Sequence, residues 1–92
     1  MKHLNIRVLG RVQGVGFRHS VRSVARFYNI KGFTRNEPDG SVYIEAEGED
    51  ENIRKFSEWC RKGPDGGRVD ELIISEGNNR GFERFEIRFT QT

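Results

Sequence analysis

The sequence predicts an α+β fold in which two helices cover one face of a single sheet. Apolar residues alternate with polar ones near both ends of the chain and near its middle, which is typical of half-buried strands. Two further segments space their apolar residues three and four positions apart, which is typical of helices. Turn-forming residues separate these segments, so the predicted order is βαββαβ followed by a terminal strand.

The N-terminal third of the chain predicts a strand, a loop and a helix. The strand contains Leu4, Ile6 and Val8, which alternate with polar residues. A glycine-rich segment, residues 10–18, follows it. A helix is then predicted from apolar residues at positions i, i+3, i+4 and i+7, which are Val21, Val24, Ala25 and Tyr28.

The middle of the chain predicts a β-hairpin. Residues 30–36 predict a second strand, and the tetrapeptide Glu-Pro-Asp-Gly at 37–40 predicts a tight turn. A third strand follows, and its buried side is expected to consist of Val42, Ile44 and Ala46.

The C-terminal half predicts a second helix and two more strands. The helix begins near Asp50, whose carboxylate is expected to cap it, and ends at Gly-Pro, residues 63–64. Residues 69–76 are apolar enough for a fourth strand, and residues 84–89 alternate in a fifth. The complete order fits a ferredoxin-like sandwich, an antiparallel sheet with both helices on one face.

Composition limits the classes of protein to consider. The 92 residues are expected to form one domain, 1–92, with a modest core. The net charge is only +2, which differs from the concentrated basic surface of a nucleic-acid-binding protein. Cys60 is the only cysteine, so no intrachain disulfide can form, and no segment is long enough to span a membrane. We therefore expect a cytoplasmic monomer that binds neither nucleic acid nor membranes.

The glycine-rich segment carries the strongest functional signal. Glycines let backbone N–H groups converge on an anion, the following helix adds its positive dipole end, and Arg18 adds a fixed fork of donors. The segment lacks the Lys-Ser/Thr of a Walker loop, and His19 stands where a dinucleotide-binding fingerprint needs glycine. The predicted phosphate-binding loop consists of Val12, Gln13, Gly14, Val15, Gly16, Phe17 and Arg18.

The predicted topology brings Asn36 to this loop. The first and second strands run in the same direction, so the loop ending at Arg18 and the strand ending at Asn36 reach the same edge of the sheet. Loop amides, one arginine and one side-chain amide can bind and polarise a phosphate, but they abstract protons poorly. No Ser-His-Asp order or histidine-rich metal spacing is visible, so we expect neither covalent catalysis nor a metal or other cofactor.

Two blocks of the sequence resemble the signature of the acylphosphatase family. The first is residues 10–18, and the second is Gly-Phe-Thr-Arg-Asn-Glu-Pro-Asp-Gly-Ser-Val at 32–42. Phe33 and Thr34 depart from the tryptophan and valine that are common there. Shorter matches extend the resemblance over almost the full chain: Ala46-Glu47-Gly48, Gly63-Pro64 with Arg68-Val69, and Phe85-Glu86-Ile87-Arg88-Phe89.

The resemblance implies metal-independent hydrolysis of acyl phosphates to a carboxylate and inorganic phosphate. It implies that Arg18 binds the phosphoryl group, that Asn36 positions the attacking water, and that the substrate phosphate assists proton transfer. The chemistry agrees, because the conjugate acid of a carboxylate leaving group has a pKa of roughly 4 and needs no protonation at neutral pH. Inorganic phosphate or sulfate should then compete with the substrate for the loop.

Two alternative functions fit the same fold. The resemblance extends to the amino-terminal part of hydrogenase-maturation carbamoyltransferases, which would make the chain an accessory or regulatory domain for carbamoyl-phosphate-type ligands. RNA-binding modules also use the ferredoxin-like sandwich. Here the polar side of the third strand carries Glu45 and Glu47, which are expected to repel a phosphate backbone.

Several candidate residues also have purely structural interpretations. An asparagine before a turn usually serves turn geometry, and only the resemblance favours a catalytic role for Asn36. We expect Gln13 to form hydrogen bonds within the loop and His19 to face solvent. Cys60 is expected to be a semi-buried core thiol, and His3, near the terminus, carries no functional signal.

Overall fold

The computed structural model describes residues 1–89 and contains every predicted helix and strand. The fifth strand is shorter than predicted, because Arg84, Arg88 and Phe89 lie outside it. In chain order the elements are β1 (Lys2–Arg11), α1 (Phe17–Phe27), β2 (Lys31–Asn36), β3 (Val42–Gly48), α2 (Asp50–Lys62), β4 (Arg68–Gly77) and β5 (Phe85–Ile87).

The strands form one sheet in the order β4-β1-β3-β2-β5. The pairs β1–β3, β1–β4 and β2–β3 are antiparallel, as predicted. The prediction of a fully antiparallel sheet is wrong at one edge, where β5 pairs parallel with β2. The connection of residues 78–84 causes this difference, because it reverses the chain while carrying it from one edge of the sheet to the other. β5 therefore runs opposite to β4 and in the same direction as β2.

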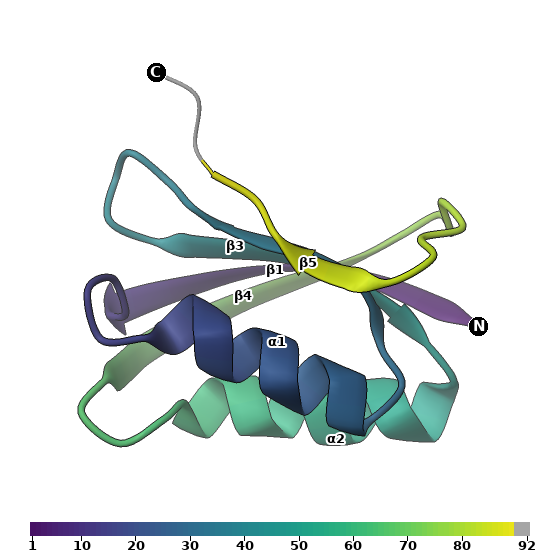
Figure 1. Ribbon diagram of the computed structural model, residues 1–92, viewed down its shortest axis with the longest axis horizontal. Helices are drawn as coiled ribbons and strands as arrows, with labels where there is room; N and C mark the ends of the chain where they lie inside the picture. The colour runs from purple at the N-terminus through teal and green to yellow at the C-terminus, as the bar shows by residue number, and fades with distance from the viewer. Residues whose placement is uncertain (90–92) are drawn as a thin grey trace.

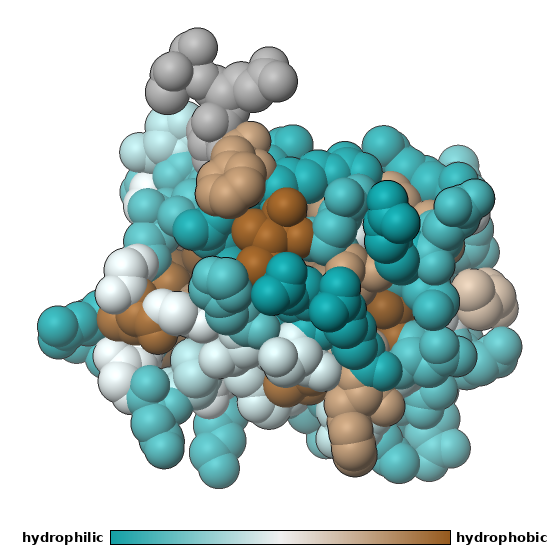
Figure 2. All heavy atoms as spheres, in the orientation of Figure 1, coloured by the Kyte–Doolittle hydropathy of each residue, from teal (hydrophilic) through white to brown (hydrophobic). Residues whose placement is uncertain are grey.

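Both helices lie on the same face of the sheet, as predicted (Figure 1). Each helix turns one apolar stripe toward the sheet: α1 buries Phe17, Val21 and Ala25, and α2 buries Ile53, Phe56 and Cys60. Burying each large side chain contributes about 1.5–3 kcal/mol. The outer surfaces of the helices are mostly hydrophilic, and hydrophobic side chains show only in small separate areas (Figure 2).

Cys60 is fully buried rather than semi-buried. Burial disfavours the thiolate and raises the pKa of the thiol well above its ordinary value. The thiolate is the reactive form of cysteine, so Cys60 is an inert member of the core.

The start of α2 differs from the prediction in one detail. The N-cap residue is Glu49, whose backbone is extended, and no side chain caps the helix by a hydrogen bond. Asp50 is instead the first helical residue. It lies with Glu51 in the first turn, where a negative charge interacts favourably with the helix dipole.

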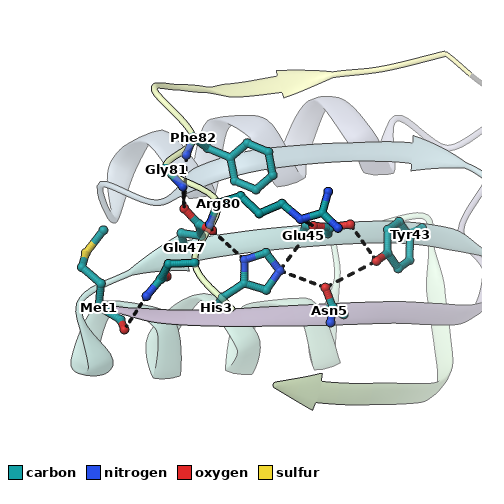
Figure 3. A network of polar contacts seen from close by, with 10 residues as sticks. Met1, His3, Asn5, Tyr43, Glu45, Glu47, Arg80, Gly81 and Phe82 are labelled. Carbon is teal, nitrogen blue, oxygen red and sulfur yellow. Dashed lines mark hydrogen bonds and ion pairs between the residues drawn. The ribbon is translucent and has the colours of Figure 1, made fainter. Parts of the chain in front are cut away.

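The face of the sheet without helices carries a buried polar cluster around His3 (Figure 3). Glu45 and Glu47 on β3 are only 6% and 1% exposed, and His3 Nδ1 donates a hydrogen bond to Glu47 at 2.7 Å. His3 Nε2 lies within hydrogen-bond distance of the Asn5 side-chain amide, 2.9 Å from Oδ1. Contrary to the sequence-based interpretation, the glutamates do not form an exposed acidic surface, and His3 is a central member of a buried network.

The segment between β4 and β5 completes this cluster. Glu47 accepts backbone N–H groups of three consecutive residues, Arg80, Gly81 at 3.1 Å and Phe82 at 3.2 Å. Burial raises the pKa of Glu47, but these amides and His3 outweigh burial and hold it below its ordinary value. Glu47 therefore attaches the crossing segment to the sheet as a carboxylate.

Candidate active site

The predicted phosphate-binding loop connects β1 to α1, and its apolar side chains anchor it. Val12 and Phe17 are each only 1% exposed, and the Phe17 ring lies 5.9 Å from the ring of Trp59 on α2. Gly14 and Gly16 lie between these anchors, with exposed backbones and φ angles of 76° and 75°. A Cβ at either glycine would meet no atom within 4 Å, so the left-handed backbone, not lack of space, favours glycine there.

The start of α1 is rich in positive charge. Gly16 is its N-cap, no side chain caps it by a hydrogen bond, and no acidic residue lies in its first turn. The first N–H groups of a helix have no partner within the helix, and the dipole places partial positive charge there. Arg18 lies in the first turn with His19, which is exposed as predicted. This arrangement favours an anionic ligand.

Arg18 differs from most other arginines in its partners. It is half-buried, and its guanidinium lies over the ring of Phe89, with 5.7 Å between Cζ and the ring centroid. Within residues 1–89 it forms no ion pair with a carboxylate. The arginines that do form such pairs are Arg7, Arg35, Arg54, Arg68, Arg80 and Arg88.

Asn36 lies at the same edge of the sheet as the loop. It is the last residue of β2 and pairs with Val42 on β3, which in turn pairs with Val8 on β1. The strand that leads into the loop and the strand that ends at Asn36 are therefore aligned. A side-chain amide so placed can hold a water molecule beside an anion in the loop.

Gln13 connects the loop to the turn that follows Asn36. Its Nε2 donates to the carbonyl oxygens of Glu37 at 2.9 Å and Ser41 at 2.8 Å. The interpretation of Gln13 as a hydrogen bonder within the loop is therefore wrong. The turn closes on itself through a hydrogen bond from Glu37 N–H to the Ser41 carbonyl at 2.9 Å. Gln13 thus braces the loop against the turn, a role that sequence reasoning missed because its partners lie more than twenty residues away.

Comparison with known proteins assigns the chain to a family. The family model described as acylphosphatase matches residues 4–87, a span that includes the loop and Asn36. The chain belongs to the acylphosphatase family. An acylphosphatase from Thermotoga maritima is 44% identical over 97% of this chain and 99% of its own length. One from Archaeoglobus fulgidus is 42% identical over 94% of this chain and 97% of its own length.

Solved structures agree with this assignment. The crystal structure of acylphosphatase from Bacillus subtilis matches with a TM-score of 0.93 and 36% identity, covering 96% of this chain and 99% of that one. Full-length HypF, in a phosphate- and nucleotide-bound form, matches with a TM-score of 0.85 and 32% identity, over 95% of this chain but 12% of that one. The protein is thus an acylphosphatase, an enzyme that hydrolyses acyl phosphates.

Among residues 1–89, no cluster of three or more His, Cys, Asp or Glu side chains could hold a metal ion. In the same part of the chain, neither helix has the length and apolar character needed to cross a membrane.

Proposed function

We propose that acyl phosphates are hydrolysed, without a metal ion, in a site formed by the loop of residues 12–18, Arg18 and Asn36. The observation that carries this proposal is the uncapped, positively charged start of α1, where two glycines in the left-handed conformation precede Arg18. A cation at this end of a helix is unfavourable unless an anion balances it. The phosphoryl group of the substrate would provide that anion.

The loop and Arg18 stabilise the phosphoryl group as the bond breaks. Backbone N–H groups and the guanidinium donate hydrogen bonds to its oxygens, where negative charge is concentrated in the transition state. The bond between phosphorus and the acyl oxygen breaks, and the electron pair leaves with the carboxylate. This leaving group needs no proton at neutral pH, so the site requires no general acid.

Asn36 positions the attacking water opposite the leaving group. The water oxygen forms the new bond to phosphorus, and a proton of the water passes to a phosphoryl oxygen of the substrate. Holding the water in line converts a bimolecular encounter into attack within a bound complex. Gln13 supports this geometry because it joins the loop to the turn that follows Asn36.

We infer further that the protein acts in the cytoplasm, without a nucleic-acid partner. The net charge of +2 and the lone cysteine support this inference. Inorganic phosphate and sulfate are expected to compete with the substrate. The alternative as a carbamoyl-phosphate-type accessory domain is supported by the similarity to HypF, and it is tested by offering carbamoyl phosphate beside benzoyl phosphate.

Metal independence predicts that chelation has no effect on the rate. We expect the purified enzyme to hydrolyse benzoyl phosphate equally fast before and after extended treatment with EDTA. The loop, Arg18 and Asn36 supply the positive charge and the water contact that a metal would otherwise provide. A rate that falls on chelation and returns when a divalent cation is added would contradict the proposal.

Asn36→Ala is expected to lower kcat and leave phosphate binding intact. A misplaced water can cost up to about a hundredfold in rate. The inhibition constant of inorganic phosphate should stay close to the wild-type value, because the loop and Arg18 remain. KM should change little, since orientation of the water matters at the transition state and hardly at substrate binding.

Asn52→Ala, at a half-buried position on α2, is the matched control and should retain the wild-type kcat. The melting temperature of Asn36→Ala separates the two interpretations of this residue. If kcat stays near the wild-type value while the melting temperature collapses, Asn36 serves turn geometry and another group holds the water.

A further inference from the structure

Phe89 lies beside Arg18, although it follows the last strand and belongs to no element of secondary structure. Its side chain is 79% exposed, and its ring centroid lies 5.7 Å from the guanidinium carbon of Arg18. This distance is within the range of a cation–π contact. An exposed aromatic ring therefore touches the residue that is proposed to bind the phosphoryl group.

The pairing of β5 with β2 directs the chain toward the end of β2 that holds Asn36. Thr34 pairs with Ile87 in the parallel ladder, and the Arg88 N–H donates to the Thr34 carbonyl at 2.8 Å. Side chains alternate along a strand, so Phe85 and Ile87 share one face of β5.

Phe85 identifies that face as the one covered by helices. Its ring lies 6.1 Å from that of Phe56 on α2, and the side chain is buried. Asn36 lies two residues after Thr34 on β2, so the two side chains lie on the same face of the sheet, and Thr34 is fully buried. Asn36 therefore lies on the covered face, and the contact of Phe89 with Arg18 lies at the start of α1 on the same face.

We propose that Phe89 is a positioning residue that holds the Arg18 guanidinium in the orientation needed to bind the phosphoryl group. This inference rests on the proposed role of Arg18. An aromatic ring contacts the flat face of a guanidinium and leaves the N–H donors, which lie in its plane, available to a ligand. A carboxylate partner would occupy those same donors and compete with the substrate.

The other arginines that lie over rings support this distinction. Arg88 lies 4.1 Å from the centroid of Phe33 and also forms an ion pair with Glu86 at 3.3 Å. Arg7 and Arg35 combine a ring contact with a carboxylate in the same way. Within residues 1–89, Arg18 is the arginine with a ring and without a carboxylate, which suits a residue that must bind an external anion.

Phe89→Leu tests the proposal because it keeps an apolar side chain and removes the aromatic face. We expect the inhibition constant of inorganic phosphate to rise about two- to five-fold, the size of an exposed cation–π contact. The value of kcat/KM for benzoyl phosphate should fall by at least the same factor. Phe89→Trp should restore both, because tryptophan is the strongest cation–π partner.

Phe27→Leu is the matched control. Phe27 is 82% exposed at the opposite end of α1 and should tolerate the same change with no effect on either constant. The proposal would be overturned if Phe89→Leu left the inhibition constant of phosphate and kcat/KM unchanged. It would also be overturned if a folded Phe89→Trp variant did not restore the wild-type values.

Two further comparisons identify how Phe89 acts. In the Arg18→Ala background, Phe89→Leu should have no additional effect, because the two residues act together. The loss in kcat/KM should be equal for benzoyl phosphate and acetyl phosphate. A loss confined to benzoyl phosphate would overturn the positioning role and assign the ring to contact with the acyl group. Failure of the proposed site itself is distinguishable, because Arg18→Ala alone would then bind phosphate like the wild type.

Discussion

Arg18→Ala is expected to leave a folded protein that hydrolyses benzoyl phosphate at least about a hundred- to a thousandfold more slowly. In the proposed mechanism the guanidinium donates to oxygens whose charge must be stabilised as the acyl phosphate bond breaks. Stability should not suffer, because the substitution removes a cation from the positive end of a helix dipole. Even Arg18→Lys should be slow, since an ammonium group cannot reproduce the fork of donors.

Phosphate binding provides a second measurement on the same variant. Inorganic phosphate at a hundred times its dissociation constant should stabilise the wild type by about 2.7 kcal/mol, which is visible as a higher melting temperature. In Arg18→Ala this rise should largely disappear. Arg22→Ala, one turn further along α1, is the matched control and should keep both the rate and the response to phosphate. A folded Arg18→Ala enzyme that retains most of its activity would exclude the proposed role.

Glu47→Gln is expected to have the largest effect on stability. Its carboxylate is almost completely buried and accepts four hydrogen bonds, from His3 and from the backbone of residues 80–82. The glutamine side chain replaces one acceptor oxygen with an NH₂ group. The N–H groups that bonded to that oxygen then have no acceptor. Each buried donor left without an acceptor typically costs about 1–3 kcal/mol. The measurement is the free energy of unfolding in urea at neutral pH.

Activity should separate Glu47 from Arg18. Glu47 pairs with His3 near the N-terminal end of β1, whereas the loop follows the C-terminal end of the same strand. At a temperature where Glu47→Gln is folded, its kcat should therefore stay close to the wild-type value. A variant that is fully stable yet inactive would contradict the structural role assigned to Glu47.

The pH dependence of stability has a definite sign. The pKa of Glu47 in the folded protein lies below its ordinary value of 4.5, so its contribution is fully present above that pH. It is lost as the pH falls through the lower, folded-state pKa. Wild-type stability should therefore decline below about pH 4.5, and Glu47→Gln should show a shallower decline. Glu71→Gln, at an exposed position on β4, should decline like the wild type.

Local patterns predicted the elements of this fold because each pattern lies within one segment. The apolar stripe of α1, the turn at residues 37–40 and the alternation in β1 depend on neighbours a few positions apart. The glycine loop is local in the same way, since its anchors and its glycines are consecutive. The direction of the first two strands then placed Asn36 at the edge where that loop lies. The catalytic roles of Arg18 and Asn36 stay predictions.

Only the tertiary structure decided which distant residues meet. His3 meets Glu47 because β1 and β3 pair in that register, and Gln13 meets the hairpin turn because both lie at one edge of the sheet. The ring of Phe89 reaches Arg18 because β5 adds to β2 in parallel, which the sequence pattern did not predict. Strand alternation specifies which face a side chain occupies, but not which strand lies beside it. Neighbouring strands are selected by packing of the whole sheet against the helices, and no single segment encodes that choice.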